Sequence, residues 1–268
     1  MIANARMYSV DTATAVAWRW LLEWVVRRAD VACEVIDYPP PQSLPALWSR
    51  DDLGCAFMCG YPFARAAPRP VLLAAPVPSP SRYAGEPMYW SDLVVHVASP
   101  AKCIDDTFGL RFAYTSEDSQ SGYHAARRFL APYAGLRGTR LFASTVGPLV
   151  TPRNVVAAIV AGDADVGPVD SYAHDLLRLH EPELTAQVRT IASTERTPIP
   201  ALVGSPTMDS AVAVRLVDAL CAVEQAAELA GIRSTLLLRR FAVVAPYDYD
   251  ELIGRAREAD RLGYPRIE

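Results

Sequence analysis

The sequence has no apolar run long enough to span a bilayer. A membrane-spanning helix needs roughly 18 or more mostly apolar residues, and the best candidate is interrupted by Arg19, Glu23 and Arg27. Residues 1–10 also lack the basic start, apolar stretch and small-residue cleavage site of a secretory signal. We therefore expect a soluble protein whose export signal was either removed or never existed.

Net positive charge is missing as well. Lys and Arg number 26 against 30 Asp and Glu, which gives a formal net charge of -4. Such a chain has no general field that attracts nucleic acid, so an anionic ligand must be held by local geometry. The 51% hydrophobic and 21% charged residues are typical of a compact folded protein, and 268 residues suffice for two α/β lobes.

Cysteine and histidine are scarce. The five cysteines are an odd and scattered set, which indicates buried thiols rather than a disulfide framework. Cys55 and Cys59 form the only close pair, and they fit either a zinc site or a strand-and-turn core. Because no second pair and no histidine cluster accompanies them, we expect no metal. His174 follows Asp170 by four residues, which is the spacing of a surface pair on a helix.

Motifs of catalysis are also absent. The sequence has no nucleophile elbow, no phosphate-binding P-loop and no dinucleotide-binding glycine pattern. Catalysis therefore has little support, and we expect no cofactor.

Along the chain, strand-like and helix-like patterns alternate, which favours an α/β fold with mostly parallel sheets flanked by helices. Expected strands cover residues 1–8, 31–38, 54–59, 71–77, 93–99, 112–115 and 164–169. Expected helices cover residues 11–29, 44–50, 119–130, 154–161, 171–179, 209–230 and 249–262.

Two proline-rich segments have the composition of connectors between lobes. They lie at residues 78–87 and 188–205. We therefore expect a discontinuous lobe I of residues 1–84 and 196–268, completed by the C-terminal helices, and a lobe II of residues 85–195. The chain would cross between the lobes twice.

The most informative segment is 114–123, where an expected strand ends and a helix begins through Ser119, Ser121 and Gly122. The first turn of a helix has unpaired backbone N–H groups and the positive end of the helix dipole. Serine hydroxyls add donors, so the segment suits the oxygens of a phosphate-like or carboxylate-like group. A plain serine cap followed by glycine is the alternative.

Four blocks, taken in order, resemble one family. They are Thr107-Phe-Gly-Leu-Arg-Phe-Ala113, Ser119-Gln-Ser-Gly-Tyr123, Gly162-Asp-Ala-Asp-Val-Gly-Pro-Val-Asp-Ser171 and Pro200-Ala-Leu-Val-Gly-Ser205. The blocks and their spacing resemble the phosphate/phosphite/phosphonate-binding family of ABC-transporter periplasmic solute-binding proteins over about residues 55–205.

The resemblance implies a two-lobed type II periplasmic-binding-protein fold with two hinge crossovers. It further implies a small anionic solute, such as a phosphonate, phosphate or related oxyanion, held in a cleft between the lobes and delivered to an ABC-transporter permease. Binding would close the hinge. The family is periplasmic, yet no signal peptide is visible, so a cytoplasmic location stays open.

The most specific block implies the oxyanion site. In the family its hydroxyls and backbone amides hold the ligand's oxyanion, which implies Ser119, Gln120, Ser121, Gly122 and Tyr123 here. The family usually has threonine where Gln120 stands, which leaves the oxyanion itself open.

Other matched positions stand near expected strand ends. Tyr8 and Tyr61 match first-lobe wall positions, although each could equally be an aromatic that caps its own sheet. Asp170 resembles the acidic position facing the ligand's amino-alkyl tail, whereas Asp165 resembles a buried structural aspartate.

The largest departure from the family falls at residues 149–155. Thr151 and Arg153 stand there in the neighbourhood where the family commonly has a histidine. Arg153 either offers a two-pronged donor to an oxyanion or is a solvated arginine in a first helical turn.

Two other functions fit the same fold, because a fold does not determine a function. One is a cytosolic enzyme similar to the chorismate-dehydratase group. The other is a ligand sensor that passes the conformational change to a protein partner.

Overall fold

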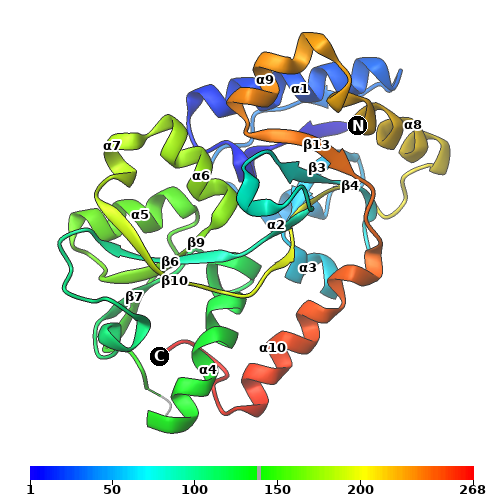
Figure 1. Cartoon of the computed structure of the whole chain (residues 1–268). Coiled ribbons are helices and arrows are strands. Elements are labelled where there is room, and N and C mark those ends of the chain that lie inside the picture. The colour runs from blue at the N-terminus through cyan, green and yellow to red at the C-terminus, as the bar shows by residue number, and fades with distance from the viewer. Residues whose placement is uncertain (138–139) are drawn as a thin grey trace. The chain divides into compact units, whose positions relative to one another are not determined.

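The computed structural model describes residues 1–137 and 140–268. Its contacts divide the chain into two compact units, one of residues 1–88 and 198–249 and one of residues 89–197 and 250–268. The chain therefore passes from unit to unit after residues 88, 197 and 249. Each unit is built on a sheet with helices packed against it (Figure 1).

The first unit has a six-stranded sheet in the order β13-β4-β12-β3-β1-β2. Its strands are β1 (Ile2–Asn4), β2 (Glu34–Val35), β3 (Leu53–Met58), β4 (Val71–Pro78), β12 (Ala201–Gly204) and β13 (Leu238–Ala242). Strand β1 pairs in parallel with β2 and β3, whereas β12 runs antiparallel to β3 and β4. Every residue of β3 is buried, so this strand lies at the centre of the core.

Helix α1 (Thr12–Arg28) begins as the sequence predicts. The Asp11 side chain accepts hydrogen bonds from the N–H groups of Ala13 and Thr14, and the Thr14 hydroxyl accepts one from the Asp11 N–H in return. The buried face of the helix contains Trp18, Leu21, Leu22 and Val25. The other α-helices in the described part of this unit are α2 (Leu44–Trp48), α3 (Gly60–Arg65), α8 (Ser210–Cys221) and α9 (Ala230–Thr235).

The second unit has a five-stranded sheet in the order β10-β6-β9-β7-β8. The strands are β6 (Ser91–His96), β7 (Arg111–Ala113), β8 (Ser144–Val146), β9 (Val166–Asp170) and β10 (Val188–Ser193). Strand β7 pairs in parallel with β8 and β9, and β6 runs antiparallel to β9 and β10. The first two unit boundaries fall inside the short strands β5 (Met88–Tyr89) and β11 (Thr197–Pro198).

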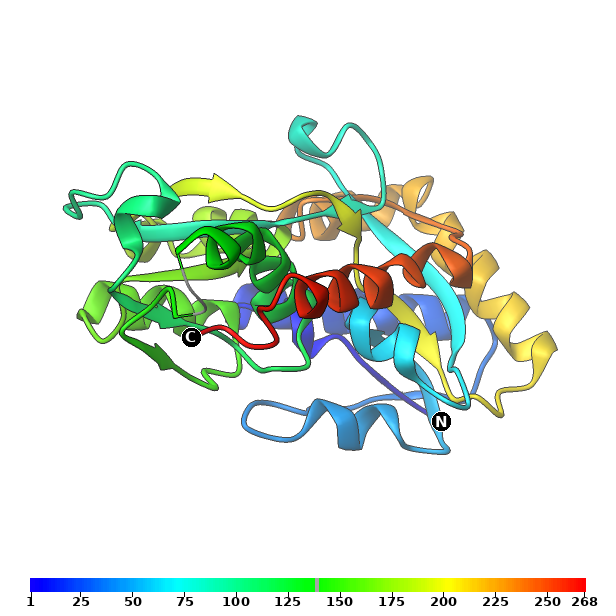
Figure 2. The same cartoon turned by 90° about the horizontal axis from the view of Figure 1, so that it is seen from below.

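Five α-helices of the second unit lie in the described residues. They are α4 (Ala125–Arg137), α5 (Pro152–Ala161), α6 (Ser171–His180), α7 (Pro182–Thr185) and α10 (Glu251–Arg261). Helix α10, red in Figures 1 and 2, packs beside α4. Across residues 1–137 and 140–268, no helix has the length and apolar character that crossing a membrane requires.

The expectation of mostly parallel sheets needs correction, because both sheets are mixed. Parallel pairs occupy one side of each sheet and antiparallel pairs the other. Most of the antiparallel pairs come from the crossings: β6 and β12 are the strands through which the chain enters a sheet after changing unit, and each runs against both of its neighbours. The remaining pair is β13 with β4 at the edge of the first sheet.

The expected lobe boundaries also need correction. Those at 84/85 and 195/196 lie within four residues of the observed 88/89 and 197/198. Residues 250–268, expected in the first lobe, belong to the second unit. The reason is packing: Ala259, Tyr264 and Ile267 are buried in the core that α4 and β7 also form.

Candidate functional site

The segment after β7 forms a capped helix start. The Ser119 hydroxyl accepts a hydrogen bond from the Gly122 N–H at 3.0 Å, so Ser119 is the N-cap. The next turn, Gln120–His124, is π-helical and leads directly into α4. A π-helical turn is wider than an α-helical one and often occurs at functional sites. The helix therefore begins where the sequence predicts, but the sequence did not predict that its first turn is π-helical.

Thr115 completes this turn, although it was not among the predicted ligand-binding residues. A Cβ atom placed on Gly122 would lie 1.8 Å from Thr115 Oγ1, so only glycine leaves room for the hydroxyl. The Thr115 side chain is 5% exposed, and its hydroxyl has no hydrogen-bond partner within residues 1–137 and 140–268. A buried hydroxyl without a partner is costly, which makes Thr115 a candidate to bind a ligand.

Ser121 and Asp170 meet at this turn, although the sequence assigned them to different ends of a ligand. The Ser121 hydroxyl lies 3.5 Å from Asp170 Oδ2, and both residues are buried. Asp170 Oδ1 accepts hydrogen bonds from the N–H groups of Tyr172 and Ala173, so Asp170 is also the N-cap of α6. The Ser91 hydroxyl donates to the Ser121 carbonyl at 2.7 Å and fixes the turn to β6.

Gln120 and Tyr123 point elsewhere. Gln120 lines the groove between α4 and α10. The Tyr123 hydroxyl accepts a hydrogen bond from the Ile267 N–H at 3.2 Å, and burial raises the pKa of this phenol. Tyr123 therefore holds the C-terminal segment in place, and a contact of Tyr123 with the bound solute stays a prediction.

Thr151 and Arg153 lie at the start of α5. The Thr151 hydroxyl accepts from the Asn154 N–H at 3.2 Å, which makes Thr151 the N-cap. The Arg153 guanidinium donates two hydrogen bonds of 2.7 Å to the Glu181 carboxylate, which raises the pKa of Arg153. Of the two alternatives, the structure therefore favours the exposed first-turn arginine, because a carboxylate already occupies its donors.

The two tyrosines of the first unit differ in exposure. Tyr8 is 1% exposed and packs edge-on against Phe57 with ring centroids 5.0 Å apart. Tyr61 is half-buried in α3, and the Arg65 guanidinium lies over its ring at 5.5 Å. Tyr8 thus matches the aromatic that packs on its own sheet, and ligand contacts of both tyrosines remain predictions.

Asp165 makes the structural contacts that the resemblance implies, but it is half-buried rather than buried. Its carboxylate accepts two hydrogen bonds of 2.9 Å from the Arg111 guanidinium and one of 2.8 Å from the Arg111 N–H. The hydrogen-bonded guanidinium holds the pKa of this carboxyl below its usual range.

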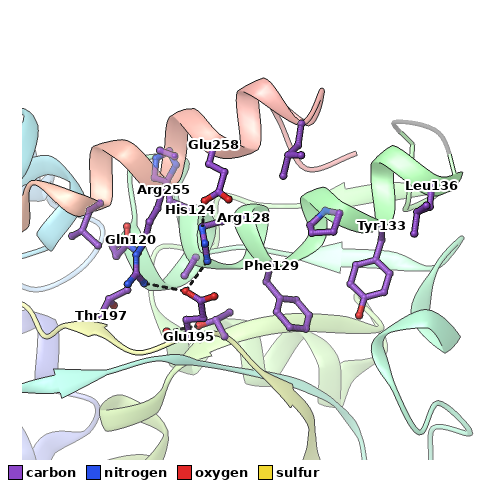
Figure 3. Close-up of a pocket in the computed structure, with 16 residues that line it drawn as sticks. Gln120, His124, Arg128, Phe129, Tyr133, Leu136, Glu195, Thr197, Arg255 and Glu258 are labelled. Carbon is purple, nitrogen blue, oxygen red and sulfur yellow. Dashed lines mark hydrogen bonds and ion pairs between the residues drawn. The ribbon is translucent and has the colours of Figure 1, made fainter.

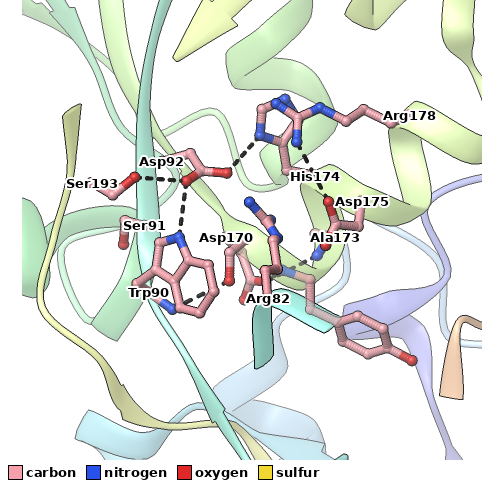
Figure 4. A network of polar contacts seen from close by, with 12 residues as sticks. Arg82, Trp90, Ser91, Asp92, Asp170, Ala173, His174, Asp175, Arg178 and Ser193 are labelled. Carbon is pink, nitrogen blue, oxygen red and sulfur yellow. Dashed lines mark hydrogen bonds and ion pairs between the residues drawn. The ribbon is translucent and has the colours of Figure 1, made fainter. Parts of the chain in front are cut away.

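The expectation of a surface pair of His174 with Asp170 is wrong. His174 is 1% exposed, and its Nδ1 lies 2.9 Å from Asp92 Oδ2. Asp92 also accepts 2.9 Å hydrogen bonds from the Trp90 indole and the Ser193 hydroxyl (Figure 4). The histidine lies on the face of α6 turned toward β6, where a buried carboxylate provides a hydrogen-bond partner for its ring nitrogen.

A hollow of the second unit lies between α4 and α10, with a volume of about 490 Å³ (Figure 3). Phe129 and Tyr133 contribute apolar surface, while Arg128 and Arg255 contribute charge. Arg128 pairs with Glu195 at 2.7 Å, and Arg255 lies 3.7 Å from the same carboxylate. Because these cations already have acidic partners, the groove is less suited to an anion than the turn.

The cysteine pair fits the strand-and-turn alternative. Cys55 lies in β3 and Cys59 directly before α3, and both are buried. Burial raises the pKa of the Cys55 thiol, which keeps it protonated. In the described part of the chain, no three His, Cys, Asp or Glu side chains gather in a group that could hold a metal ion.

Comparison with solved structures identifies the fold. A binding-protein component of an ABC phosphonate transporter from Pseudomonas aeruginosa has a TM-score of 0.84 at 16% identity, over 98% of this chain and 87% of that chain. PhnD1 from Prochlorococcus marinus, in complex with methylphosphonate, has a TM-score of 0.79 at 16% identity, over 97% of this chain and 98% of that chain. The periplasmic aliphatic sulphonate-binding protein SsuA of Escherichia coli has a TM-score of 0.56 at 20% identity, over 98% of this chain and 85% of that chain. The chain thus has the predicted type II periplasmic-binding-protein fold.

The family follows from a sequence model. The model described as "ABC transporter, phosphonate, periplasmic substrate-binding protein" matches residues 12–249, which is most of the chain. The chain therefore belongs to this family of transporter substrate-binding proteins, and the prediction of a solute-binding protein rather than an enzyme is confirmed. No curated protein matches the sequence.

Proposed function

We propose that this chain binds a small phosphonate at the turn of residues 115–122 and delivers it to the permease of an ABC transporter. The observation that carries the proposal is the Thr115 hydroxyl, which is buried without a partner among the described residues and lies beside Gly122. An oxyanion here accepts hydrogen bonds from Thr115 and from backbone N–H groups of the first helical turn, and from Ser121 once its hydroxyl turns from Asp170 Oδ2 to the ligand. The matched family and the methylphosphonate complex of PhnD1 support the phosphonate class.

Asp170 makes the site selective for a ligand that carries a donor. Its Oδ2 lies beside the Ser121 hydroxyl, where an unprotonated oxyanion would experience repulsion. A phosphonate monoanion carries a P–OH group, which can donate to this carboxylate, whereas a sulfonate has no such proton. An ammonium group on the ligand's tail is the other donor that Asp170 suits.

Calorimetry with methylphosphonate tests the site. Replacing Thr115 with Val keeps the shape and removes the hydroxyl, so affinity falls by about 1–3 kcal/mol. Ser121→Asp places a carboxylate at the anion position and abolishes binding. Ser144→Asp is the matched control, because Ser144 is an exposed residue of β8 in the same unit. Unchanged affinity in folded Ser121→Asp protein would mean that the turn is only a helix cap.

A ligand series separates the two roles of Asp170. We expect methylphosphonate to bind and methanesulfonate to bind far more weakly. Asp170→Asn should reduce this difference in affinity between the two ligands. The asparagine oxygen still caps α6, so the variant keeps the helix start. If 2-aminoethylphosphonate binds more tightly than methylphosphonate, and only in the wild type, Asp170 faces the cationic tail. Equal affinity of all three ligands for the wild type and for Asp170→Asn would exclude both roles.

A further inference from the structure

The first unit contains a hollow of its own, at the carboxyl ends of β1 and β2. Its volume is about 220 Å³, and its lining includes Asn4, Arg6, Trp18, Leu22 and Ile36. Ligands of open α/β sheets bind outside the carboxyl ends of the strands. The hollow therefore occupies a position suited to a small ligand, and all its lining residues belong to the first unit.

Arg6 is the notable side chain of this pocket. Its guanidinium lies over the Tyr38 ring at 5.7 Å and donates one hydrogen bond to the Gln42 carbonyl. Within residues 1–137 and 140–268, no carboxylate pairs with it. Burial lowers the pKa of this guanidinium, because it removes part of the hydration that stabilises the cation.

Arg19, the other arginine of the pocket, is different. Its guanidinium donates to the Asp37 carboxylate and to the Val35 carbonyl, and it lies 3.9 Å from Glu23. The pocket thus contains one cation with acidic partners and one with none. A single unpaired guanidinium suits a monoanion, and its planar pair of donors matches the two oxygens of a carboxylate.

The walls of the pocket are held in place. Trp18 is 1% exposed, and its indole N–H donates to the Tyr8 carbonyl at 3.1 Å. The Asn4 side chain donates to the Ile36 carbonyl at 2.8 Å and accepts from the Arg6 N–H at 2.9 Å. Leu22 and the pair Pro39 and Pro40 add apolar surface. A preformed pocket of this kind favours a compact apolar ligand body with one polar group at its end.

We propose that this pocket binds a small monocarboxylate with a compact apolar body, whose carboxylate pairs with Arg6. The apolar part of the ligand packs against Trp18, Leu22 and the two prolines. This site is additional to the phosphonate turn, which belongs to the second unit.

Benzoate is the probe, because it combines one carboxylate with a rigid apolar ring that fits the volume. In NMR titrations, benzoate binding should shift the backbone signals of residues 4–9 and 35–40. Benzamide has the same shape without charge, and acetate has the charge without the ring, so both should bind at least about tenfold more weakly. Saturating methylphosphonate should leave benzoate affinity unchanged.

The matched protein variants are Arg6→Met and Arg28→Met. Both arginines lie over an aromatic ring, since the Arg28 guanidinium lies 5.3 Å from the Trp24 ring, but Arg28 does not line the pocket. Arg6→Met should weaken benzoate at least about tenfold, and Arg28→Met should leave it unchanged. The proposal is overturned if wild-type protein does not bind benzoate, if benzamide binds equally well, or if methylphosphonate displaces benzoate.

Discussion

Thr115 and Gly122 illustrate how one residue creates room for another. The threonine hydroxyl lies where a Cβ on residue 122 would stand, so the glycine is required by close approach and not by its backbone angles. The same glycine N–H donates to Ser119, which closes the turn. The shape of the proposed anion site thus depends on the absence of a single methyl group.

Replacing Gly122 with Ala should therefore damage both fold and function. The new methyl group would stand 1.8 Å from Thr115 Oγ1 and 2.9 Å from Thr115 Cβ, so the turn must shift. We expect a loss of about 1–3 kcal/mol in the free energy of unfolding, as is usual for overpacking, together with a loss of methylphosphonate affinity. Urea denaturation and calorimetry measure the two effects.

Gly254 provides the control for this substitution. It lies inside α10, and a Cβ there would meet nothing within 4 Å. Gly254→Ala should leave ligand affinity unchanged and raise stability by about 0.5–1 kcal/mol, because glycine is a poor residue in a helix interior. If Gly122→Ala behaved like Gly254→Ala, the close approach to Thr115 would not constrain the turn.

Single residues were predictable where their partners are close in sequence. The Ser119 cap depends on Gly122, three residues away, and it was expected. The partner of Arg153 is Glu181, and the partner of His174 is Asp92, 82 residues away. No local pattern reveals such pairs, because tertiary packing creates them. Thr115 did have a signal, since it lies just beyond the end of β7.

At the scale of elements, one ion pair joins β7 to the turn before β9. Arg111 in β7 donates both guanidinium and backbone N–H groups to Asp165. The side-chain hydrogen bonds from Arg111 lower the pKa of Asp165 in the folded protein. The contribution to stability is therefore present above the unfolded pKa of about 3.9 and is lost as pH falls through the lower, folded pKa.

Arg111→Met should make the protein less stable at pH 7, and the difference from wild type should shrink as the pH falls below about 4. Urea denaturation at pH 7, 5 and 3.5 measures this difference. Arg178→Met is the control, because Arg178 is exposed and its contact with Asp175 is long, at 3.4 Å. A stability difference for Arg111→Met that stays constant across this range would show that the pair does not act through the charge of Asp165.

Elements were predictable where a cap or a short pattern defines them, as for α1 and α6. The expected helix over residues 209–230 was wrong in its extent: α8 ends at Cys221, and short 3-10 turns lead to α9 and then to β13. Alanine and leucine continue the helical pattern through this break, so composition does not reveal it. The chain instead turns back to pair β13 with β4 at the edge of the sheet.

At the scale of the whole molecule, the third crossing is the feature that the sequence did not predict. The proline-rich connectors indicated the first two crossings within a few residues. The crossing after residue 249 has no such composition, and the packing of the C-terminal segment defines it instead. Arg127, 3% exposed, donates to the carbonyls of Ala256, Tyr264 and Pro265, which fastens that segment to α4.

Tyr264→Ala should therefore destabilise the second unit, although the first unit immediately precedes this segment in sequence. Tyr264 is 0% exposed and belongs to the core that Phe112 and Leu130 share, so its truncation should cost about 3–5 kcal/mol. Hydrogen exchange should show lost protection in residues 112–137 and native protection in residues 53–78. Tyr247→Ala is the matched control: Tyr247 is 74% exposed in the first unit, and its truncation should change stability by less than about 0.5 kcal/mol. Lost protection confined to residues 53–78 in Tyr264→Ala would instead place the C-terminal segment in the first unit.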